Sequence, residues 1–71
     1  MFKYVITTNR VFSSVFNDEE KAFNHHFKLT RKNKYNKVSI DKVFNAAFYE
    51  YVKDFDFNVL RRNAVIGWMN E

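Results

Sequence analysis

A small α+β fold made of short strands and three helices is predicted for this chain of 71 residues. Alternating apolar and polar residues open the sequence, a pattern that is typical of a strand. Through most of the remaining chain, apolar residues recur three and four positions apart, a spacing that is typical of helices. Proline is absent and Gly67 is the only glycine, so a long disordered or low-complexity segment is not expected.

The beginning of the chain predicts a strand followed by a helix. Residues 2–8, FKYVITT, alternate and form the expected strand. From residue 10 to residue 28 the apolar positions have helical spacing, with one gap near Glu19. Two alternatives remain open for residues 10–28. The helix could be broken near Asn17, where NDEE would start a separate helix capped by Asn17, and residues 10–16, RVFSSVF, could instead be a strand.

The middle of the chain contains the surplus of positive charge. Residues 28–37, KLTRKNKYNK, include five basic side chains and no acid, in a chain whose net charge is +4. The five are Lys28, Arg31, Lys32, Lys34 and Lys37. Such a segment is expected in a protein that binds nucleic acid or another acidic surface, and it is equally compatible with a solvated loop. Its backbone could form a hairpin, with residues 27–32 paired to residues 37–40, or an open loop.

A second short strand is predicted directly after this basic segment. Residues 37–41, KVSID, alternate, so that Val38 and Ile40 face the interior while Lys37 and Ser39 face outward. This strand and the helices after it, residues 37–70, form the second half of one small domain that comprises residues 1–71.

Two helices are predicted for the remainder. Asp41 is the expected cap of the first, whose apolar face extends to Phe55. Asp56 is the expected cap of the second. The apolar side of this last helix consists of Leu60, Ala64, Val65, Trp68 and Met69.

The order of strand, helix, turn and helix in residues 37–70 resembles the ribbon-helix-helix family of DNA-binding proteins, the MetJ and Arc type. The match is best in the final helix, where capping, leucine, basic, small and aromatic residues follow one another as in that family. The matching residues are Phe55, Asp56, Phe57, Asn58, Leu60, Arg61, Arg62, Ala64, Val65, Trp68 and Met69. The turn between the helices departs from the family, because it lacks the usual Gly or Asn. Residues 1–36 would be an N-terminal strand-helix extension.

The resemblance implies how such a protein would bind duplex DNA. Two protomers pair their strands into a ribbon that enters the major groove, which admits a two-stranded ribbon. The outward side chains Lys37 and Ser39 would then contact bases. Backbone N–H groups and basic side chains near the start of the final helix would contact phosphates. The residues implied for phosphate contacts are Phe57, Asn58, Arg61 and Arg62.

The function expected from these observations is that of a small DNA-binding regulator of transcription, a repressor of phage or plasmid type. A chain of this size has a marginal core, and without cysteine it has neither disulfides nor a thiolate zinc site. Its aromatic content of 20% favours a buried subunit interface, so a homodimer is expected. The alternative is a protein–protein interaction module or inhibitor, such as a phage protein that acts on a host protein. A third hypothesis is single-strand binding through Tyr35.

Enzyme activity, a cofactor and a metal site are not expected. The sequence has no thiol nucleophile, no glycine-rich phosphate loop and no G-x-S-x-G element. His25 and His26 are adjacent, whereas histidines that bind one metal from a helix are spaced three or four residues apart. No apolar run approaches the roughly 20 residues of a membrane-spanning helix, and the first residues lack the layout of a signal peptide. We therefore expect a cytoplasmic protein.

Overall fold

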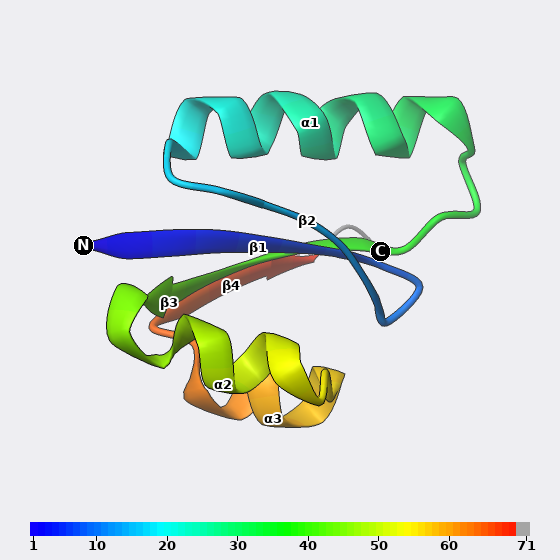
Figure 1. The fold of residues 1–71 in the computed structure, drawn as a ribbon. Coiled ribbons are helices and arrows are strands. Elements are labelled where there is room, and N and C mark those ends of the chain that lie inside the picture. The colour runs from blue at the N-terminus through cyan, green and yellow to red at the C-terminus, as the bar shows by residue number, and fades with distance from the viewer. Residues whose placement is uncertain (70–71) are drawn as a thin grey trace.

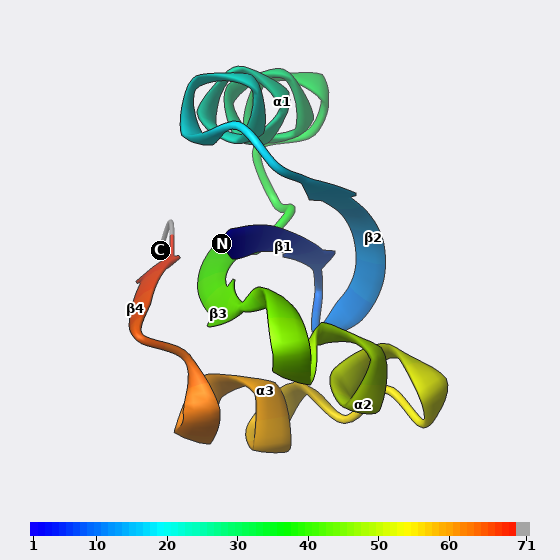
Figure 2. The same cartoon turned by 60° about the vertical axis from the view of Figure 1, so that its left-hand side comes forward.

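The computed structural model describes residues 1–69 and has a four-stranded antiparallel sheet in the order β2-β1-β3-β4 (Figure 1). The elements along the chain are β1 (Phe2–Thr8), β2 (Val11–Phe16), α1 (Glu19–Lys32), β3 (Val38–Phe44), the 3₁₀ helix η1 (Asn45–Ala47), α2 (Phe48–Lys53), α3 (Phe57–Asn63) and β4 (Ile66–Met69). α1 covers one face of the sheet, and α2 and α3 cover the other (Figure 2). The α+β class is confirmed, with more strands than predicted.

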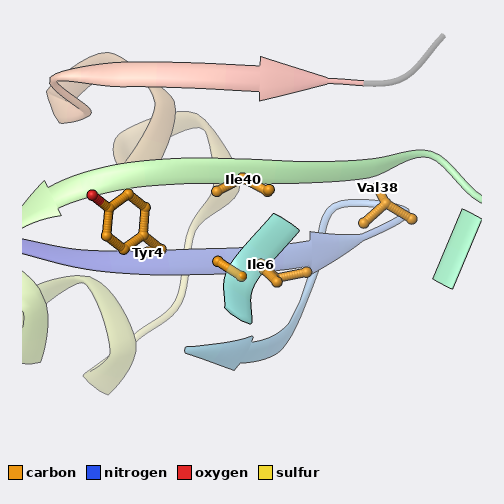
Figure 3. Packing of buried hydrophobic residues seen from close by; sticks show 5 residues of the cluster. Tyr4, Ile6, Val38 and Ile40 are labelled. Atoms are coloured by element: carbon orange, nitrogen blue, oxygen red, sulfur yellow. The ribbon is translucent and has the colours of Figure 1, made fainter. Parts of the chain in front are cut away.

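Apolar clusters lie on both faces of the sheet, so β1 and β3 are buried on two sides. Toward α1, the buried side chains are Tyr4, Ile6, Ala22, Val38 and Ile40 (Figure 3). Toward α2 and α3 they are Val5, Val43, Phe48 and Leu60. The inward orientation of Val38 and Ile40 is confirmed. The outward orientation predicted for the other side of this strand is wrong for Ser39, which α2 and α3 cover, whereas Lys37 is exposed as predicted.

Residues 10–16 are a strand, so the helix predicted over residues 10–28 is wrong in its first part. β1 and β2 are joined by a two-residue turn, Asn9 and Arg10, whose φ angles are 52° and 68°. Positive φ at both central residues matches the right-handed twist of the flanking strands. The Val and Phe residues that follow suit a pleated, half-buried strand, and the alternative left open for this segment is confirmed.

The helix α1 begins at Glu19 because Asp18 caps it. The carboxylate of Asp18 accepts a hydrogen bond of 3.0 Å from a backbone N–H of the first turn. A separate helix start within NDEE is therefore confirmed, with the cap one residue after Asn17. α1 continues to Lys32, so the hairpin considered for residues 27–32 is not formed. Acidic residues in the first turn and basic residues in the last complement the helix dipole.

β3 extends to Phe44, beyond the predicted end at residue 41. Asp41 is consequently not a helix cap but a fully buried residue in the middle of this strand. The helix predicted after Asp41 is reduced to η1 and α2, because pairing with β1 continues to the end of β3. α3 begins where predicted, with Asp56 as its cap.

The last four residues of the described chain form β4 and not the end of a helix. β4 pairs antiparallel with β3, and Trp68 packs edge-on against Phe23 of α1, with 5.0 Å between the ring centroids. β3 is therefore hydrogen-bonded on both sides, to β1 and to β4. Neither edge of this strand can pair with a second protomer unless the sheet opens. The ribbon arrangement implied by the family resemblance is not the arrangement of this sheet.

Candidate nucleic-acid interface

The end of α1, the α1–β3 connection and the β1–β2 turn lie at the same end of the molecule (Figure 1), and these segments contain six exposed cations. We call them the basic end: Arg10, Lys28, Arg31, Lys32, Lys34 and Lys37. The whole basic segment of the sequence belongs to this group, and Arg10 joins it from the β1–β2 turn. Within residues 1–69 the ion pair between Arg61 and Asp41 is the only one in the structure, so these six charges are not neutralised by acidic partners of that part of the chain.

The connection from α1 to β3 is an ordered turn. The backbone N–H of Asn36 donates to the carbonyl of Asn33 at 3.0 Å, and the N–H of Tyr35 donates to the Asn33 side chain at 2.9 Å. The side chain of Asn36 reaches back to the carbonyl of Leu29 in α1 at 3.3 Å. These local hydrogen bonds are the usual means by which asparagine stabilises a turn. The lysines of this segment are therefore presented from a defined backbone.

Asn9 joins the β1–β2 turn to the same segment. Its backbone N–H donates to the carbonyl of Lys37 at 2.8 Å, and its side-chain oxygen accepts from the N–H of Lys37 at 2.9 Å. A third hydrogen bond, of 3.4 Å, connects its amide to the side chain of Asn36. Arg10, the next residue, is thereby held close to the start of β3, with its guanidinium over the ring of Phe57 at 5.6 Å.

Two exposed aromatic rings lie among these cations. Tyr35 is 78% exposed and Phe27 is 58% exposed. The ammonium of Lys34 lies 5.2 Å from the centre of the Tyr35 ring, and the guanidinium of Arg31 lies 5.4 Å from that of Phe27. Flat rings next to cations can stack on nucleobases while the cations contact phosphates.

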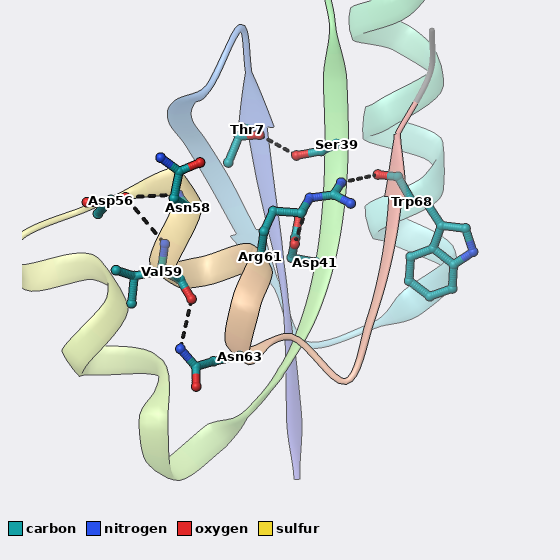
Figure 4. A network of polar contacts seen from close by, with 9 residues as sticks. All are labelled: Thr7, Ser39, Asp41, Asp56, Asn58, Val59, Arg61, Asn63 and Trp68. Carbon is teal, nitrogen blue, oxygen red and sulfur yellow. Dashed lines mark hydrogen bonds and ion pairs between the residues drawn. The ribbon is translucent and has the colours of Figure 1, made fainter.

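The base-contacting pair implied by the family resemblance is divided by the fold. Lys37 is exposed and belongs to the basic end. Ser39 is fully buried, and its hydroxyl is hydrogen-bonded to that of Thr7 on the neighbouring strand (Figure 4). A base contact by Ser39 is therefore excluded in this structure, because α2 and α3 cover the face of β3 on which it lies.

The phosphate contacts implied for the start of α3 are also corrected. The carboxylate of Asp56 accepts hydrogen bonds from the N–H groups of Asn58 and Val59, at 2.9 Å and 3.3 Å (Figure 4). The backbone donor of Asn58 is thus occupied by a negative group, which would also repel a phosphate. Phe57 is partly buried, and the guanidinium groups of Arg10 and Arg61 lie 5.6 Å and 5.5 Å from the centre of its ring.

Arg61 has a structural role, whereas the neighbouring Arg62 is exposed. The Nε of Arg61 lies 3.1 Å from the carboxylate of Asp41, and its Nη2 donates to the carbonyl of Trp68 at 3.0 Å (Figure 4). Gly67 makes room for this guanidinium, since a Cβ at that position would lie 2.8 Å from Nη1 of Arg61. Arg61 is therefore not available to a phosphate, and the contact predicted for Arg62 stays a prediction.

Burial raises the pKa of Asp41, and the nearby charge of Arg61 acts against this rise. Asp41 is fully buried in the middle of the sheet, where an unpaired carboxylate would be costly. Arg61 from α3 supplies the counter-charge. Arg61 thus connects α3 to β3 and β4, through Asp41 and the carbonyl of Trp68. The carboxylate of Asp41 is not exposed to solvent.

The two adjacent histidines pack against different groups. The ring of His25 lies 5.3 Å from that of Phe16, and Nε2 of His26 donates to the carbonyl of Val38 at 3.0 Å. His26 thereby connects α1 to the start of β3. The two side chains point to different partners, as expected for neighbouring helix positions.

Arg10 and Asn9 were not among the predicted site residues. The sequence does contain a signal for them, because Asn followed by one residue between two β-type stretches is typical of a two-residue hairpin turn. The apolar residues after Arg10, Val11, Phe12, Val15 and Phe16, obscure that signal. Their separations of three and four positions also fit a helix, although Val and Phe are equally suited to a strand.

Comparison with models of protein families, with curated proteins and with solved structures found no match to this chain. Among the helices of the described residues, none has the length and apolar content needed to cross a membrane.

Proposed function

We propose that this protein binds nucleic acid through the basic end and acts as a small DNA-binding regulator, with duplex DNA as its first partner. The observation that supports the proposal is the convergence of six exposed cations from three separate segments on one end of the molecule. Unpaired surface charge of one sign attracts a polyanion and raises its association rate. Contacts with phosphates supply most of the affinity in sequence-independent binding.

The hydrogen bonds that fix the α1–β3 connection strengthen this proposal. Asn33, Asn36 and Asn9 fix the backbone on which Lys34 and Lys37 stand. A fixed backbone reduces the conformational entropy that a flexible lysine-rich loop would lose when it binds. Lys37 therefore keeps the DNA-contacting role that the family resemblance implies, but from the basic end and not from a ribbon.

A titration of fluorescently labelled duplex DNA, followed by anisotropy at several salt concentrations, tests the proposal. We expect affinity to fall steeply between about 50 and about 200 mM salt. Lys34→Ala and Lys37→Ala, each made alone, should weaken binding and reduce the slope of log K against log salt by about 0.9 for each phosphate that the variant no longer neutralises. The exposed Lys53 of α2 offers a matched control, since Lys53→Ala removes one charge from the other layer of the molecule.

The proposal fails if wild-type protein shows no salt-dependent binding, or if Lys53→Ala weakens binding as much as either single replacement in the basic end. Circular dichroism of each variant confirms that the fold is retained, which is expected because all three lysines are exposed.

A protein-binding module is the second candidate, supported by the end of the sheet opposite the basic end. Met1, Phe44 and Tyr49 are 91%, 54% and 77% exposed there. The N–H of Asn45 donates to the carbonyl of Met1 at 2.9 Å, which holds this group together. Exposed aromatic residues are typical anchors of protein interfaces. Binding to a protein through this patch should be insensitive to salt and lost in Tyr49→Glu, and retention of binding in that variant would argue against the patch.

A further inference from the structure

A hollow of about 280 Å³ lies between the end of β2 and the exposed side of α1. Its lining consists of Phe16, Lys21, Asn24, His25 and Lys28. Asn24, His25 and Lys28 follow Lys21 by three, four and seven positions, so the four helical residues form one stripe along α1. Phe16 comes from β2 and places its ring beside that of His25, at 5.3 Å and an interplanar angle of 50°.

The chemistry of this lining differs from that of the basic end, with which the hollow shares only Lys28. The rings of Phe16 and His25 provide two flat surfaces that are inclined at 50° to each other. The amide of Asn24 has both a donor and an acceptor, a combination that can pair with the edge of a nucleobase. Lys21 and Lys28 stand at the two ends of the stripe and provide positive charge. The volume is just below the range of roughly 300–1,000 Å³ that is usual for small-molecule sites, so it suits a single small group.

The charges along α1 differ on the two sides of the hollow, being acidic at the start of the helix and basic at its end. Asp18, Glu19 and Glu20 precede Lys21 at the start of the helix, whereas the residues after Lys28 lead into the basic end. A phosphate would be repelled at the first side and attracted at the second. A strand whose base occupies the hollow would therefore continue past Lys28 along the basic end, where Tyr35 offers a further exposed ring.

We infer that the hollow binds one unpaired nucleotide of a nucleic acid whose backbone lies along the basic end. The base stacks on the ring of Phe16, beside His25, and is hydrogen-bonded by Asn24, while Lys28 contacts its phosphate. This inference rests on the proposed function, and it adds a preference for nucleic acid with a single-stranded part.

Two fluorescent probes test the inference: a blunt DNA duplex and the same duplex with a short single-stranded thymidine tail. Wild-type protein should bind the tailed duplex about fivefold or more tightly, as expected from stacking of a base on an aromatic ring. Asn24→Ala and Phe16→Leu should reduce this preference toward one and leave the affinity for the blunt duplex unchanged. Asn24 is exposed, and alanine favours helix, so Asn24→Ala tests the site without loss of the fold.

Asn45→Ala is the matched control, because Asn45 is also exposed but lies in η1, at the opposite end of the sheet. It should retain the preference for the tail. The inference is overturned if wild-type protein binds both probes equally, or if Asn24→Ala and Phe16→Leu both retain the preference. The proposed function fails separately, if neither probe binds in a salt-dependent manner. Loss of binding to both probes on replacing Lys34 and Lys37, with the preference unchanged in both Asn24→Ala and Phe16→Leu, would support the proposed function and refute the inference.

Discussion

Arg61 makes three contacts that hold the second layer of the molecule to the sheet. Its guanidinium meets the carboxylate of Asp41 and the carbonyl of Trp68, and it lies 5.5 Å from the centre of the Phe57 ring. Its side chain is 28% exposed, whereas that of Asp41 is fully buried. The loss of Arg61 therefore leaves a buried acid without a counter-charge. Breaking one side of such a pair is far more costly than replacing both partners.

We expect Arg61→Met to lower the free energy of unfolding by about 3 kcal/mol, the usual effect of leaving a buried charge unpaired. Urea denaturation measures this change. Arg62→Met is the control, because its side chain is exposed and exposed substitutions change stability by roughly 0.5 kcal/mol or less. The double variant Asp41→Leu with Arg61→Met should recover part of the loss. Equal effects of Arg61→Met and Arg62→Met would refute a structural role of the pair.

The pKa of Asp41 predicts a dependence of stability on pH. Burial raises this pKa above the ordinary value of 3.8, so the folded protein binds the proton of Asp41 more tightly than the unfolded chain does. The contribution of Asp41 to stability is therefore greatest at acid pH. It falls as the pH rises from 3.8 toward the raised pKa, and is constant above it.

Asp41→Asn should remove this contribution, so the difference between its urea midpoint and that of the wild type should change over this pH range. Arg61→Met should extend the range to higher pH, because the positive charge that lowers the pKa of Asp41 is lost. A constant difference between wild type and Asp41→Asn at every pH would show that Asp41 has no raised pKa.

The turn between β1 and β2 connects the fold to the basic end. Asn9 combines two properties there: it adopts a φ of 52°, and its side chain accepts a hydrogen bond from the backbone of Lys37. Asparagine tolerates left-handed backbone better than most residues with a side chain. The same residue thus allows the hairpin and positions the start of β3.

Replacing Asn9 in two ways separates these properties. Asn9→Gly keeps the positive φ but loses the side-chain hydrogen bonds, and we expect a loss of about 1 kcal/mol. Asn9→Ala adds the cost of a left-handed alanine, so the loss should be about 2 kcal/mol. Thermal or urea unfolding measures both. If the alanine variant is as stable as the glycine variant, backbone conformation at this position has no part in the stability of the turn.

The short strand β4 leaves one edge of the sheet open to a second copy of the chain. Val65 and Ile66, at the start of this edge, are each 46% exposed. An exposed apolar edge is a place where strands of two molecules can pair. The homodimer stays a proposal, and in this form it uses β4 and not β3, because both edges of β3 are already paired.

Light scattering at several protein concentrations tests the dimer. We expect a mass twice that of the 8.6 kDa chain, and Ile66→Lys should shift it to the mass of one chain, because a charge on an edge strand opposes pairing. Val59→Lys is the control, since Val59 is also partly exposed, at 39%, but lies in α3. A wild-type mass of one chain at all concentrations would overturn the dimer.

Local chemistry was sufficient to predict several elements. The alternation of residues 2–8 predicts β1, and the carboxylate of Asp56 predicts the start of α3, because a strand pattern and a capping side chain act within a few residues. The concentration of positive charge in residues 28–37 is also evident from the sequence. The conformation of this segment was not predicted, because lysine and arginine are compatible with a helix, a hairpin or a loop.

The tertiary structure alone decided the remainder. Asp41 resembles a helix cap in the sequence, yet it lies in mid-strand because β3 pairs with β1 and β4, and Arg61, twenty residues later, supplies its counter-charge. Ser39 resembles an outward-facing strand residue, yet α2 and α3 cover its side of the sheet. Residues 66–69 have helical spacing, yet they form β4 because β3 offers them an unpaired edge. Interactions between residues close in the sequence thus specify β1, the start of α3 and the basic segment. Pairing between distant strands decides which faces are buried and brings the segments that contain the six cations to one end.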